Sequence, residues 1–465
     1  WQKLCMVFKV FRIFLQNKTV TRMNSKTMSF PHETKITDQA SKTINKICYG
    51  VDTMKRLLKT IISVSLSIGL LAGCSTGSMF PGNIRSYDRG KIDEHVVRAN
   101  NDFAFNVFRQ LDSEDGEKNI FISPLSISAA LTMAYQGAGS TTRDAMAETL
   151  GYNDMEIEKI NESFKNLLGM LNRKDKKIEI NISNSIWYRQ GRKIKDEFLS
   201  VNKDIFGASV SELDFSDPES ADKINRWISD STKGKIEKMI EPPIPADVVM
   251  YLINAIYFKG EWTEKFDKNL TFNSEFHSGN GRVSDIMMMY KNGNAEYGAG
   301  DQWKAVRLPY GKGSMSMYCI LPEEGISVND FIADMNTEKW EQIKGSISET
   351  EDVVLQIPRF KIDYGIKELK DSLTAMGMGE AFTGGADFSG IREDIYISSV
   401  MHKAVVEVNE EGSEAAAATV VEMTEAAAAE PIMFIADRPF VFIIADDETG
   451  SVLFMGKVFD GADIG

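Results

Sequence analysis

Apolar residues recur along the chain with two periods, and these divide the part from about residue 92 onward into helices and strands. Residues 93–111 and 125–135 carry apolar side chains at helical spacing. Ser123-Pro124 stands just before the second stretch. Serine followed by proline favours a helix start, because the hydroxyl caps free backbone amides and proline fits the first turn. A third helix is expected from residue 141 to about residue 151.

Strands are predicted where apolar residues alternate with polar ones or form short unbroken runs. Residues 248–258 are almost continuously apolar, as in a strand that is buried on both faces. Near the C-terminus, two apolar runs flank the turn-forming residues 446–450 and indicate a hairpin. We find no internal repeat and no linker between about residues 92 and 459, which indicates one large domain of mixed α and β structure. The predicted strands cover residues 178–187, 248–258, 305–310, 314–321, 353–360, 401–408, 440–445 and 451–458.

One segment near the C-terminus fits no ordinary element. Gly412 is followed by alanines at 415–418 and again at 426–429. Alanine favours helix, whereas the glycine before it and the β-branched residues 419–421 behind it do not. If the segment is instead a strand, every residue on one face from 413 to 419 is small, and glutamates lie on the other face. Two interpretations stay open: an alanine-rich linker, or a segment small enough to enter a sheet.

Composition is typical of a globular protein and excludes several kinds of site. The chain has 465 residues, of which 43% are hydrophobic and 26% charged, and its net charge is −14. Such an acidic chain is not expected to be held on nucleic acid by its charge. The four cysteines and four histidines are too scattered for a disulfide framework or a metal site.

Motifs of common enzymes are also missing from the sequence. It contains no phosphate-binding loop and no zinc-protease motif. The one Gly-x-Ser-x-Gly match, at residues 73–77, does not stand between a predicted strand and a predicted helix, as a nucleophile elbow would. We therefore expect no enzyme, no cofactor and no metal.

The N-terminal part of the chain carries an export signal. The basic residues 54–59 precede an uncharged, largely apolar run at 60–72, and small residues follow. This is the pattern of a secretory signal peptide, and the run is shorter than the roughly 20 residues that a membrane-spanning helix needs. We interpret residues 54–73 as the signal peptide and Met54 as the start of translation. Residues 1–53 are then an upstream extension of the reading frame.

Leu71-Ala72-Gly73-Cys74, at the end of this signal, resembles the lipobox of prokaryotic lipoproteins. The resemblance implies cleavage before Cys74 and attachment of lipid to its sulfur. The protein would then be exported and held by this lipid on the outer side of a membrane, at the cell surface or in the cell envelope. Residues 74–91, rich in Ser, Gly, Asn and Arg, indicate a tether, and residues 92–465 are expected to form the folded domain.

Three longer motifs together resemble the serpins, the family of serine protease inhibitors. They occur in order and at fitting distances, and the stretches 224–236, 386–390 and 450–459 are similar as well. The resemblance covers about residues 92–460. The three motifs are residues 119–127 (NIFISPLSI), residues 254–262 (NAIYFKGEW) and residues 402–442, in which HKAV is followed by EEGS, the alanines and DRPFVF.

This resemblance implies an α+β fold with three β-sheets, about eight or nine helices and an exposed reactive-centre loop. It also implies a suicide mechanism in place of enzymatic turnover. A target serine protease attacks the loop and forms an acyl-enzyme. The cleaved loop then inserts into the central sheet as a new strand and traps the protease in a covalent 1:1 complex. A cysteine protease is an alternative partner, and the inhibitor is expected to be a monomer.

Functional positions of the family can be matched residue by residue. Small hinge residues can enter between packed strands, and buried hydroxyl, amide and imidazole groups can exchange hydrogen bonds as strands part. The hinge, where insertion begins, corresponds to Glu410, Glu411, Gly412, Ser413, Glu414, Ala415, Ala416, Ala417, Ala418 and Thr419. The shutter beneath the opening sheet corresponds to Ser123, Ser126, Asn254 and His402, and the breach at the top of that sheet corresponds to Trp262.

The family pattern also implies a scissile bond. Counting 14 positions from Gly412 (412 + 14 = 426) gives the bond Ala426–Ala427. A small residue before the bond suits an elastase-like or subtilisin-like protease, and the absence of Lys and Arg from residues 419–430 disfavours a trypsin-like one. Because the stretch from Gly412 to Pro439 is about two residues longer than in typical members, the attacked residue has alternatives: Met423, Thr424, Glu425 and Ala428.

A non-inhibitory serpin, acting as a binding or structural protein, is the alternative function. Such members often carry bulky, charged or proline residues at the inward-facing hinge positions. Here those positions hold Ser413, Ala415, Ala417 and Thr419, which favours the inhibitor.

Overall fold

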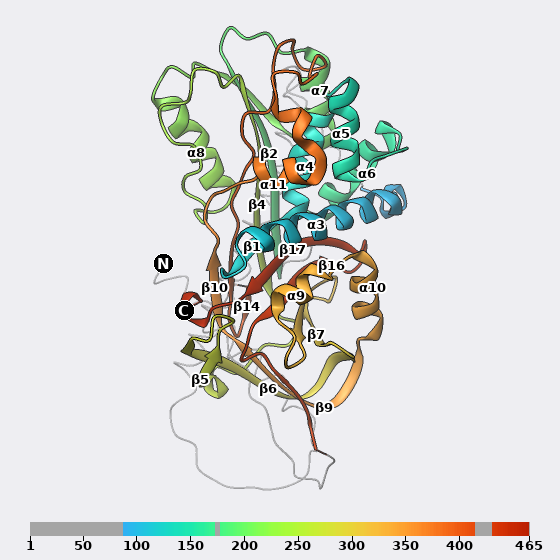
Figure 1. The fold of residues 1–465 in the computed structure, drawn as a ribbon, viewed down its shortest axis with the longest axis vertical. Coiled ribbons are helices and arrows are strands. Elements are labelled where there is room, and N and C mark those ends of the chain that lie inside the picture. The colour runs from blue at the N-terminus through green and yellow to red at the C-terminus, as the bar shows by residue number, and fades with distance from the viewer. Residues whose placement is uncertain (1–86, 173–176, 414–429, 465) are drawn as a thin grey trace, which may run out of the picture. The chain divides into compact units, whose positions relative to one another are not determined.

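The computed structural model describes residues 87–172, 177–413 and 430–464, all within the unit Arg85–Gly465 (Figure 1). The expected upstream extension, the signal peptide and Cys74 lie outside these residues, as does most of the expected tether. Among the described helices, none is both long and apolar enough to span a membrane.

Nine α-helices lie in the described part of the chain, and together with the sheets they confirm the α+β fold class. Their bounds are α3 (Glu94–Glu114), α4 (Pro124–Tyr135), α5 (Ser140–Leu150), α6 (Ile157–Leu171), α7 (Asp196–Phe206), α8 (Glu219–Ser231), α9 (Val328–Ala333), α10 (Thr337–Ser346) and α11 (Lys370–Leu373). Short 3₁₀ or π turns are η2 (Arg89–Lys91), η3 (Lys268–Leu270), η4 (Thr374–Met378), η5 (Gly379–Phe382) and η6 (Gly461–Asp463).

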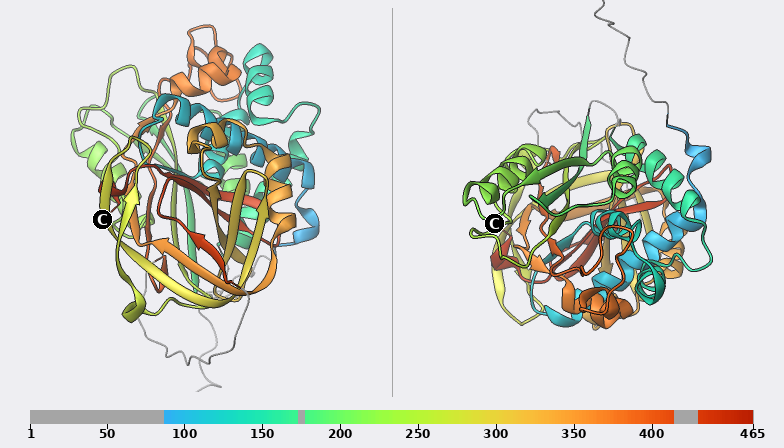
Figure 2. Two further views of the ribbon diagram at one scale, coloured as in Figure 1. Left: turned by 60° about the horizontal axis from the view of Figure 1, so that its bottom comes forward. Right: turned by 90° about the horizontal axis from the view of Figure 1, so that it is seen from above.

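The largest sheet has nine strands in the order β1-β17-β16-β8-β7-β6-β9-β15, and β5 pairs with β6 beside this path. The long strand β6 curves round the end of the domain opposite α4–α7 (Figures 1 and 2). The strands are β1 (Ile120–Ile122), β5 (Phe272–His277), β6 (Val283–Gly300), β7 (Trp303–Tyr310), β8 (Met315–Pro322), β9 (Ser348–Pro358), β15 (Ile432–Ile435), β16 (Phe440–Asp446) and β17 (Ser451–Val458).

The remaining strands form a second sheet and two short ladders that carry the candidate site. A four-stranded sheet has the order β14-β4-β2-β3, and β10–β13 and β11–β12 are separate pairs. Their bounds are β2 (Ile178–Arg189), β3 (Ser209–Leu213), β4 (Met250–Glu261), β10 (Phe360–Asp363), β11 (Lys367–Glu368), β12 (Met401–His402), β13 (Val405–Val408) and β14 (Gly412–Ser413).

Two predicted strands are each divided in the structure. The strand predicted at 353–360 is divided at Arg359: β9 ends at Pro358, and β10 begins at Phe360 in another sheet. The strand predicted at 401–408 is divided into β12 and β13. The prediction of single strands was wrong because apolar side chains lie in a core on both sides of each division: Leu355 and Phe360 in the main core, and Met401 and Val406 in two different cores. The apolar pattern therefore continues through a corner at which the backbone changes sheet.

Helix α4 is buried along nearly its whole length, and Ala130 is its one residue that is not fully buried. Its start is the predicted one: the Ser123 side chain accepts a hydrogen bond from the Ser126 amide, and Pro124 occupies the first turn. The helix contacts β4, β17 and the helices α3, α5 and α7. By contrast, α8 packs against β2 and β4 with a small apolar core of its own, which includes Trp187 and Ile228.

A buried ion pair joins α3 to the last strand. The Lys457 ammonium, which is fully buried, contacts the Asp112 carboxylate and also donates to the Gly116 carbonyl (2.7 Å) and to Asn329 Oδ1 (3.1 Å). Burial lowers the pKa of Lys457, and the Asp112 carboxylate only partly offsets this. Such a pair is sensitive to loss of one partner, because the other charge is then left buried alone.

We predict that Lys457→Met lowers the free energy of unfolding by about 3–5 kcal/mol and that the double variant Asp112→Leu/Lys457→Met regains most of this loss. Urea denaturation monitored by circular dichroism measures both. The matched control is Lys91→Met, which removes a lysine from the exposed pair with Glu162 and should have little effect. Equal losses for Lys457→Met and Lys91→Met would contradict the prediction.

Candidate functional site

A cleft runs between β4 on one side and β12 and β13 on the other. It consists of two cavities, a narrow one of about 30 Å³ and a wide one of about 150 Å³. The narrow cavity lies between Phe258 and Ile256 of β4 and Val406 of β13, with Phe121 and Phe454 also lining it.

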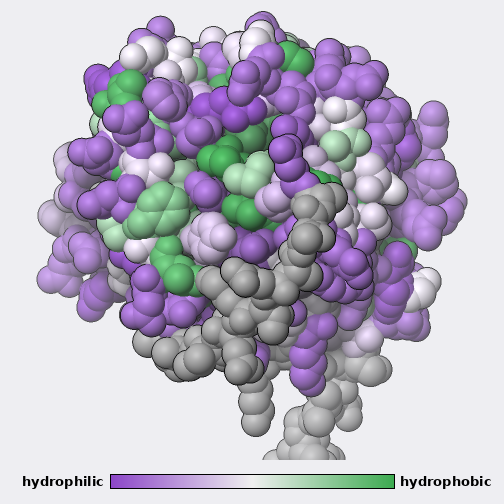
Figure 3. Space-filling model, turned by 90° about the horizontal axis from the view of Figure 1, so that it is seen from below, coloured by the Kyte–Doolittle hydropathy of each residue, from purple (hydrophilic) through white to green (hydrophobic). Residues whose placement is uncertain are grey.

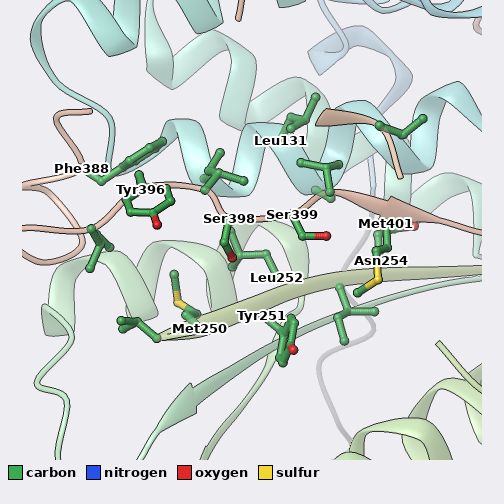
Figure 4. Close-up of a pocket in the computed structure, with 18 of the residues that line it drawn as sticks. Leu131, Met250, Tyr251, Leu252, Asn254, Phe388, Tyr396, Ser398, Ser399 and Met401 are labelled. Atoms are coloured by element: carbon green, nitrogen blue, oxygen red, sulfur yellow. The ribbon is translucent and has the colours of Figure 1, made fainter. Parts of the chain in front are cut away.

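The wide cavity continues the cleft past His402. It lies between residues 250–254 of β4 and residues 394–402, with α4 behind it, and Figure 4 shows Met250, Leu252 and Met401 on its two sides. Among the described residues, β4 has no ladder partner on the side of the cleft beyond Gly260, because β14 pairs only with Glu261 and Gly260.

The chain enters this cleft at Gly412 and Ser413. Both residues pair with the end of β4, Gly412 opposite Glu261 and Ser413 opposite Gly260. Gly412 has φ 137°, and a Cβ atom here would lie 2.1 Å from the Gly260 carbonyl oxygen, so only glycine fits. The Ser413 hydroxyl is buried and forms a hydrogen bond with the Tyr310 hydroxyl (3.1 Å).

Trp262 locks the turn that leads into this pairing. Its ring stacks on Tyr310 with centroids 4.4 Å apart and an interplanar angle of 11°. The indole Nε1 donates to the Asn409 carbonyl (2.9 Å), and the backbone amide donates to the Glu411 carbonyl (2.9 Å). The tryptophan thus holds both ends of the turn, Asn409 to Gly412, against the end of β4.

Two buried glutamates in the same turn are held by cations from distant segments. Glu410 and Glu411 are 1% and 2% exposed. Glu410 accepts from Arg359 (2.5 Å) and Thr271 (2.7 Å). Burial raises the pKa of Glu410, but the hydrogen bonds from Arg359 and Thr271 outweigh it and leave the pKa below its usual value. It is therefore a carboxylate at neutral pH.

Glu411 is bound in the same manner by two lysines. Its carboxylate contacts Lys265 (2.8 Å) and Lys268 (3.0 Å), and the hydrogen bond from Lys265 raises the pKa of that lysine. Both cations come from the segment just behind β4. The two glutamates therefore anchor the hinge turn at two places: Glu411 on the segment behind β4, and Glu410 on Arg359 between β9 and β10.

The polar residues beneath the cleft are all attached to the start of α4. On one side, His402 Nε2 accepts from the Ser123 amide (3.0 Å), and the Ser123 hydroxyl donates to the Leu453 carbonyl (2.8 Å). On the other side, the Ser126 hydroxyl donates to Asn254 Oδ1. His402 and Asn254 thus face the same cavity from opposite strands and share one helix as their support.

Asn254 is also hydrogen-bonded to the neighbouring strand, β2. Its amide Nδ2 donates to Asn184 Oδ1 (2.6 Å), and Asn184 Nδ2 donates to the Phe206 carbonyl (2.7 Å). The amides are buried or half-buried, and each of their oxygen and nitrogen atoms has a hydrogen-bond partner, so moving β4 away from α4 means exchanging several hydrogen bonds together.

The expected hinge, breach and shutter residues fall into two groups in the structure. The hinge turn and Trp262 meet at one end of the cleft, and the four shutter residues surround the start of α4 in the middle of it. The remaining expected positions lie outside the described residues: the hinge residues Glu414, Ala415, Ala416, Ala417, Ala418 and Thr419, the bond Ala426–Ala427, and its alternatives Met423, Thr424, Glu425 and Ala428.

Sequence reasoning missed the partners of these residues. Tyr310, Asn184 and the cations at Lys265, Lys268 and Arg359 lie far along the chain from the residues they hold. Only Asn184 had a signal, since it is a polar side chain at an apolar position of the predicted alternating strand 178–187, in register with Ile182 and Ile186.

The described residues contain no group of three or more His, Cys, Asp or Glu side chains placed to hold a metal ion. Cys319 is a buried free thiol, and burial raises its pKa to about 12. It is therefore not a reactive thiolate at neutral pH.

Comparison with known proteins gives the family. The chain matches the family model Serpin (serine protease inhibitor) over residues 98–461. A curated relative, an uncharacterized serpin-like protein of Methanosarcina mazei, is 33% identical over 428 aligned residues that cover 87% of this chain and 98% of that protein. Iripin-2 of Ixodes ricinus is 33% identical over 371 residues, covering 78% and 93%.

Comparison with solved structures gives the same family. The thermophilic serpin tengpin in its native state superposes with a TM-score of 0.72 at 32% identity, covering 79% of this chain and 95% of that one. The chain therefore belongs to the serpin family, whose members are in general protease inhibitors and not enzymes.

The buried imidazole makes stability depend on pH. Burial lowers the pKa of His402 to about 4, below its usual 6.5, so the folded protein resists protonation that the unfolded chain accepts. The stability that the neutral His402 imidazole contributes is fully present above pH 6.5 and is lost as the pH falls toward 4. Between pH 7.5 and 5 we expect a loss of about 2 kcal/mol in the free energy of unfolding.

Urea titrations at several pH values measure this slope. His402→Gln should flatten it between pH 7.5 and 5, a range above the ordinary pKa of carboxyl groups. The exposed His277→Gln is the control and should keep the wild-type slope. An unchanged slope in His402→Gln would show that another group carries the effect.

Proposed function

We propose that the protein is a suicide-substrate inhibitor of serine endopeptidases that traps its target by inserting the cleaved loop into the cleft between β4 and β13. The observation that carries this proposal is the pairing of Gly412 and Ser413 with β4 at the mouth of the cleft. This pairing already gives the direction and register of a further strand.

The register predicts the partner of every inserted residue. Because the pairs are 412 with 261 and 413 with 260, residue numbers sum to 673 (412 + 261), and continuation places Ala415 opposite Phe258 and Ala417 opposite Ile256. Directly paired residues of antiparallel strands point to the same face. Since Ser413 points into the core, every second residue after it would do so too.

The sizes of the inward residues match the two cavities. Ala415 and Ala417 fall beside Phe258 and Ile256 at the narrow cavity of about 30 Å³. Larger residues follow at the wide cavity of about 150 Å³. There the register sets Thr419 opposite Asn254, Val421 opposite Leu252 and Met423 opposite Met250.

Electrostatics and hydrogen bonding favour insertion in this register. Glu414, on the outer face, would lie opposite Lys259, and opposite charges on paired residues stabilise a sheet. Over about a dozen residues, new backbone hydrogen bonds at about 1 kcal/mol each and the burial of Val421 and Met423 give on the order of 10–20 kcal/mol. A gain of this size can drive insertion against distortion of the bound protease.

The target we propose is an elastase-like or subtilisin-like protease that attacks Ala426–Ala427. The support is the row of small residues there and the absence of Lys and Arg from residues 419–430. Attack after Glu425 would instead indicate a glutamate-selective enzyme, and attack after Met423 one with a larger apolar pocket. Cysteine proteases are the second class of target, and the complex is expected to contain one inhibitor and one protease.

We predict that elastase or subtilisin forms a complex with the protein that survives boiling in denaturant. Ala415→Glu would place an unpaired carboxylate beside Phe258, at a cost of several kcal/mol. We expect at least a tenfold rise in the number of inhibitor molecules consumed per protease inhibited. Ser413→Arg should act in the same way. Denaturing gels and titration of protease activity measure both.

The matched control is Ala416→Glu, which introduces the same charge one residue later on the outer face, where Lys235 and Glu407 form an ion pair at the edge of the cavity. It should keep inhibition close to wild type. Cleavage of the loop at every protease ratio without a stable complex would contradict trapping and favour the non-inhibitory alternative. The mass of the released C-terminal fragment identifies the cleaved bond.

We further propose that the inhibitor is exported and anchored to a membrane by lipid on Cys74. The support is the signal at residues 54–73 and its Leu-Ala-Gly-Cys end. In a bacterial host, Cys74→Ser should move the protein from the membrane fraction to the soluble fraction and abolish labelling with radioactive palmitate. Unchanged fractionation and labelling of this variant would exclude the anchor.

A further inference from the structure

We propose that Lys367 and Glu368, the two residues of β11, are positioning residues for insertion of the cleaved loop. They hold one wall of the wide cavity in place, and this wall, residues 394–402, is named here the β12 wall. The proposal rests on the proposed inhibitory function, because the position of the wall matters for inhibition only if a strand enters the cavity.

The β12 wall needs a support because the wide cavity is lined largely by apolar side chains. Met250 and Leu252 of β4 lie on one side of it, and Ile395 and Ile397 lie on the other. Figure 4 shows Leu252 and Ser399 on these two sides. Atoms that line a cavity lack neighbours on one side and lose dispersion contacts, so walls that are free to move draw together.

Glu368 binds the β12 wall directly. Its carboxylate accepts hydrogen bonds from the Val400 amide (2.9 Å) and from the Ser399 hydroxyl. Backbone pairing extends this contact, since Lys367 lies opposite His402 in the ladder of β11 and β12. The wall is therefore attached to β11 from Ser399 to His402.

Lys367 binds the end of α3. Its ammonium contacts the carboxylates of Asp115 (2.9 Å) and Glu114 (3.1 Å). Burial raises the pKa of Asp115, but hydrogen bonds from Lys118, Tyr364 and this lysine outweigh it and leave the pKa well below its usual value. Neighbouring residues of a strand point to opposite sides, so β11 connects to α3 through one residue and to the β12 wall through the other.

Apolar packing fixes β11 at one end only. Leu369, just after it, is fully buried, whereas Ile366, just before it, is 45% exposed. Tyr396 of the β12 wall is also 45% exposed. The other five exposed large hydrophobic residues of the described part lie on β5, β6 and β15, at the end of the domain that Figure 3 views. Polar contacts therefore decide where the start of β11 and the β12 wall lie.

The end of α3 is a firm support for this connection. Asp112, three residues before Asp115, forms the buried ion pair with Lys457 of β17. The β12 wall is thus connected in series, through Glu368 to β11 and through Lys367 to α3. If either link is lost, the wall moves toward β4 and narrows the cavity that the larger loop residues enter.

The test measures how fast the intact protein takes up a fluorescent peptide with the sequence of residues 413–423, followed by polarisation. Lys367→Met and Glu368→Ala should each slow uptake about 5- to 10-fold, as expected for loss of hydrogen bonds to a charged group. Because the two links act in series, the double variant should be no slower than the slower single variant. Lys367→Arg, which keeps the charge, should stay within about twofold of the wild type.

The matched control is Lys118→Met, which removes another lysine from the same Asp115 carboxylate but from the segment after α3. It should stay within about twofold of the wild type. In Lys367→Met, kcat/KM for cleavage of the loop by elastase or subtilisin should not change, which separates insertion from a general defect. Thermal melts check that all variants fold.

Uptake by Lys367→Met as fast as that by Lys118→Met overturns the proposal, as does a double variant slowed by the product of the two single effects. A wild-type protein that takes up no peptide overturns it too. Peptide uptake needs no protease, so failure of the wild type to trap a protease contradicts the proposed function and leaves this comparison intact.

Discussion

The pairing of Gly412 and Ser413 with the end of β4 is the constraint on which the rest of the site depends. It fixes where the reactive segment leaves the sheet, and it sets the register of any strand that follows. The pairing is possible only because residue 412 has no side chain, since the Gly260 carbonyl occupies the place of a Cβ atom. Trp262 and the two buried glutamates hold this turn from three sides, so the hinge is fixed while the strands beyond it are apart.

Both walls of the cleft are hydrogen-bonded to the start of helix α4. His402 on one wall and Asn254 on the other are bonded to Ser123 and Ser126 at the start of the same helix. A buried polar group is costly to leave without a partner, so neither wall can shift alone without loss. The network therefore holds both walls in the arrangement described here and opposes partial separation of the strands. The cap that begins α4 is thus both a local folding signal and part of the site.

The sequence was most informative where local chemistry alone decides structure. The Ser-Pro start of α4, the C-terminal hairpin and the glycine at the hinge are all local features, and each lies where the pattern indicates. Patterns were misleading at Arg359 and between β12 and β13, because burial of both halves conceals a corner. The cations that pair with Glu410 and Glu411 could not be predicted from the sequence. They come from segments 50 or more positions away, and a surface lysine that pairs with a buried carboxylate has no signature of its own in sequence.

The order of side-chain sizes along the proposed reactive segment matches the sizes of the two cavities of the cleft. Under the proposed mechanism, insertion would proceed from the hinge, so the residues nearest Gly412 would enter first, at the narrow cavity between Phe258 and Val406. Only small side chains pass there without displacing packed neighbours, and overpacking a tight core opposes entry. Larger residues gain most from burial. They come last along the segment, where the volume of the cavity is about five times larger (150 Å³ against 30 Å³). Under the proposed mechanism, low resistance at the start and a large gain at the end would make insertion both fast and irreversible, and a trap that competes with release of its protease needs both.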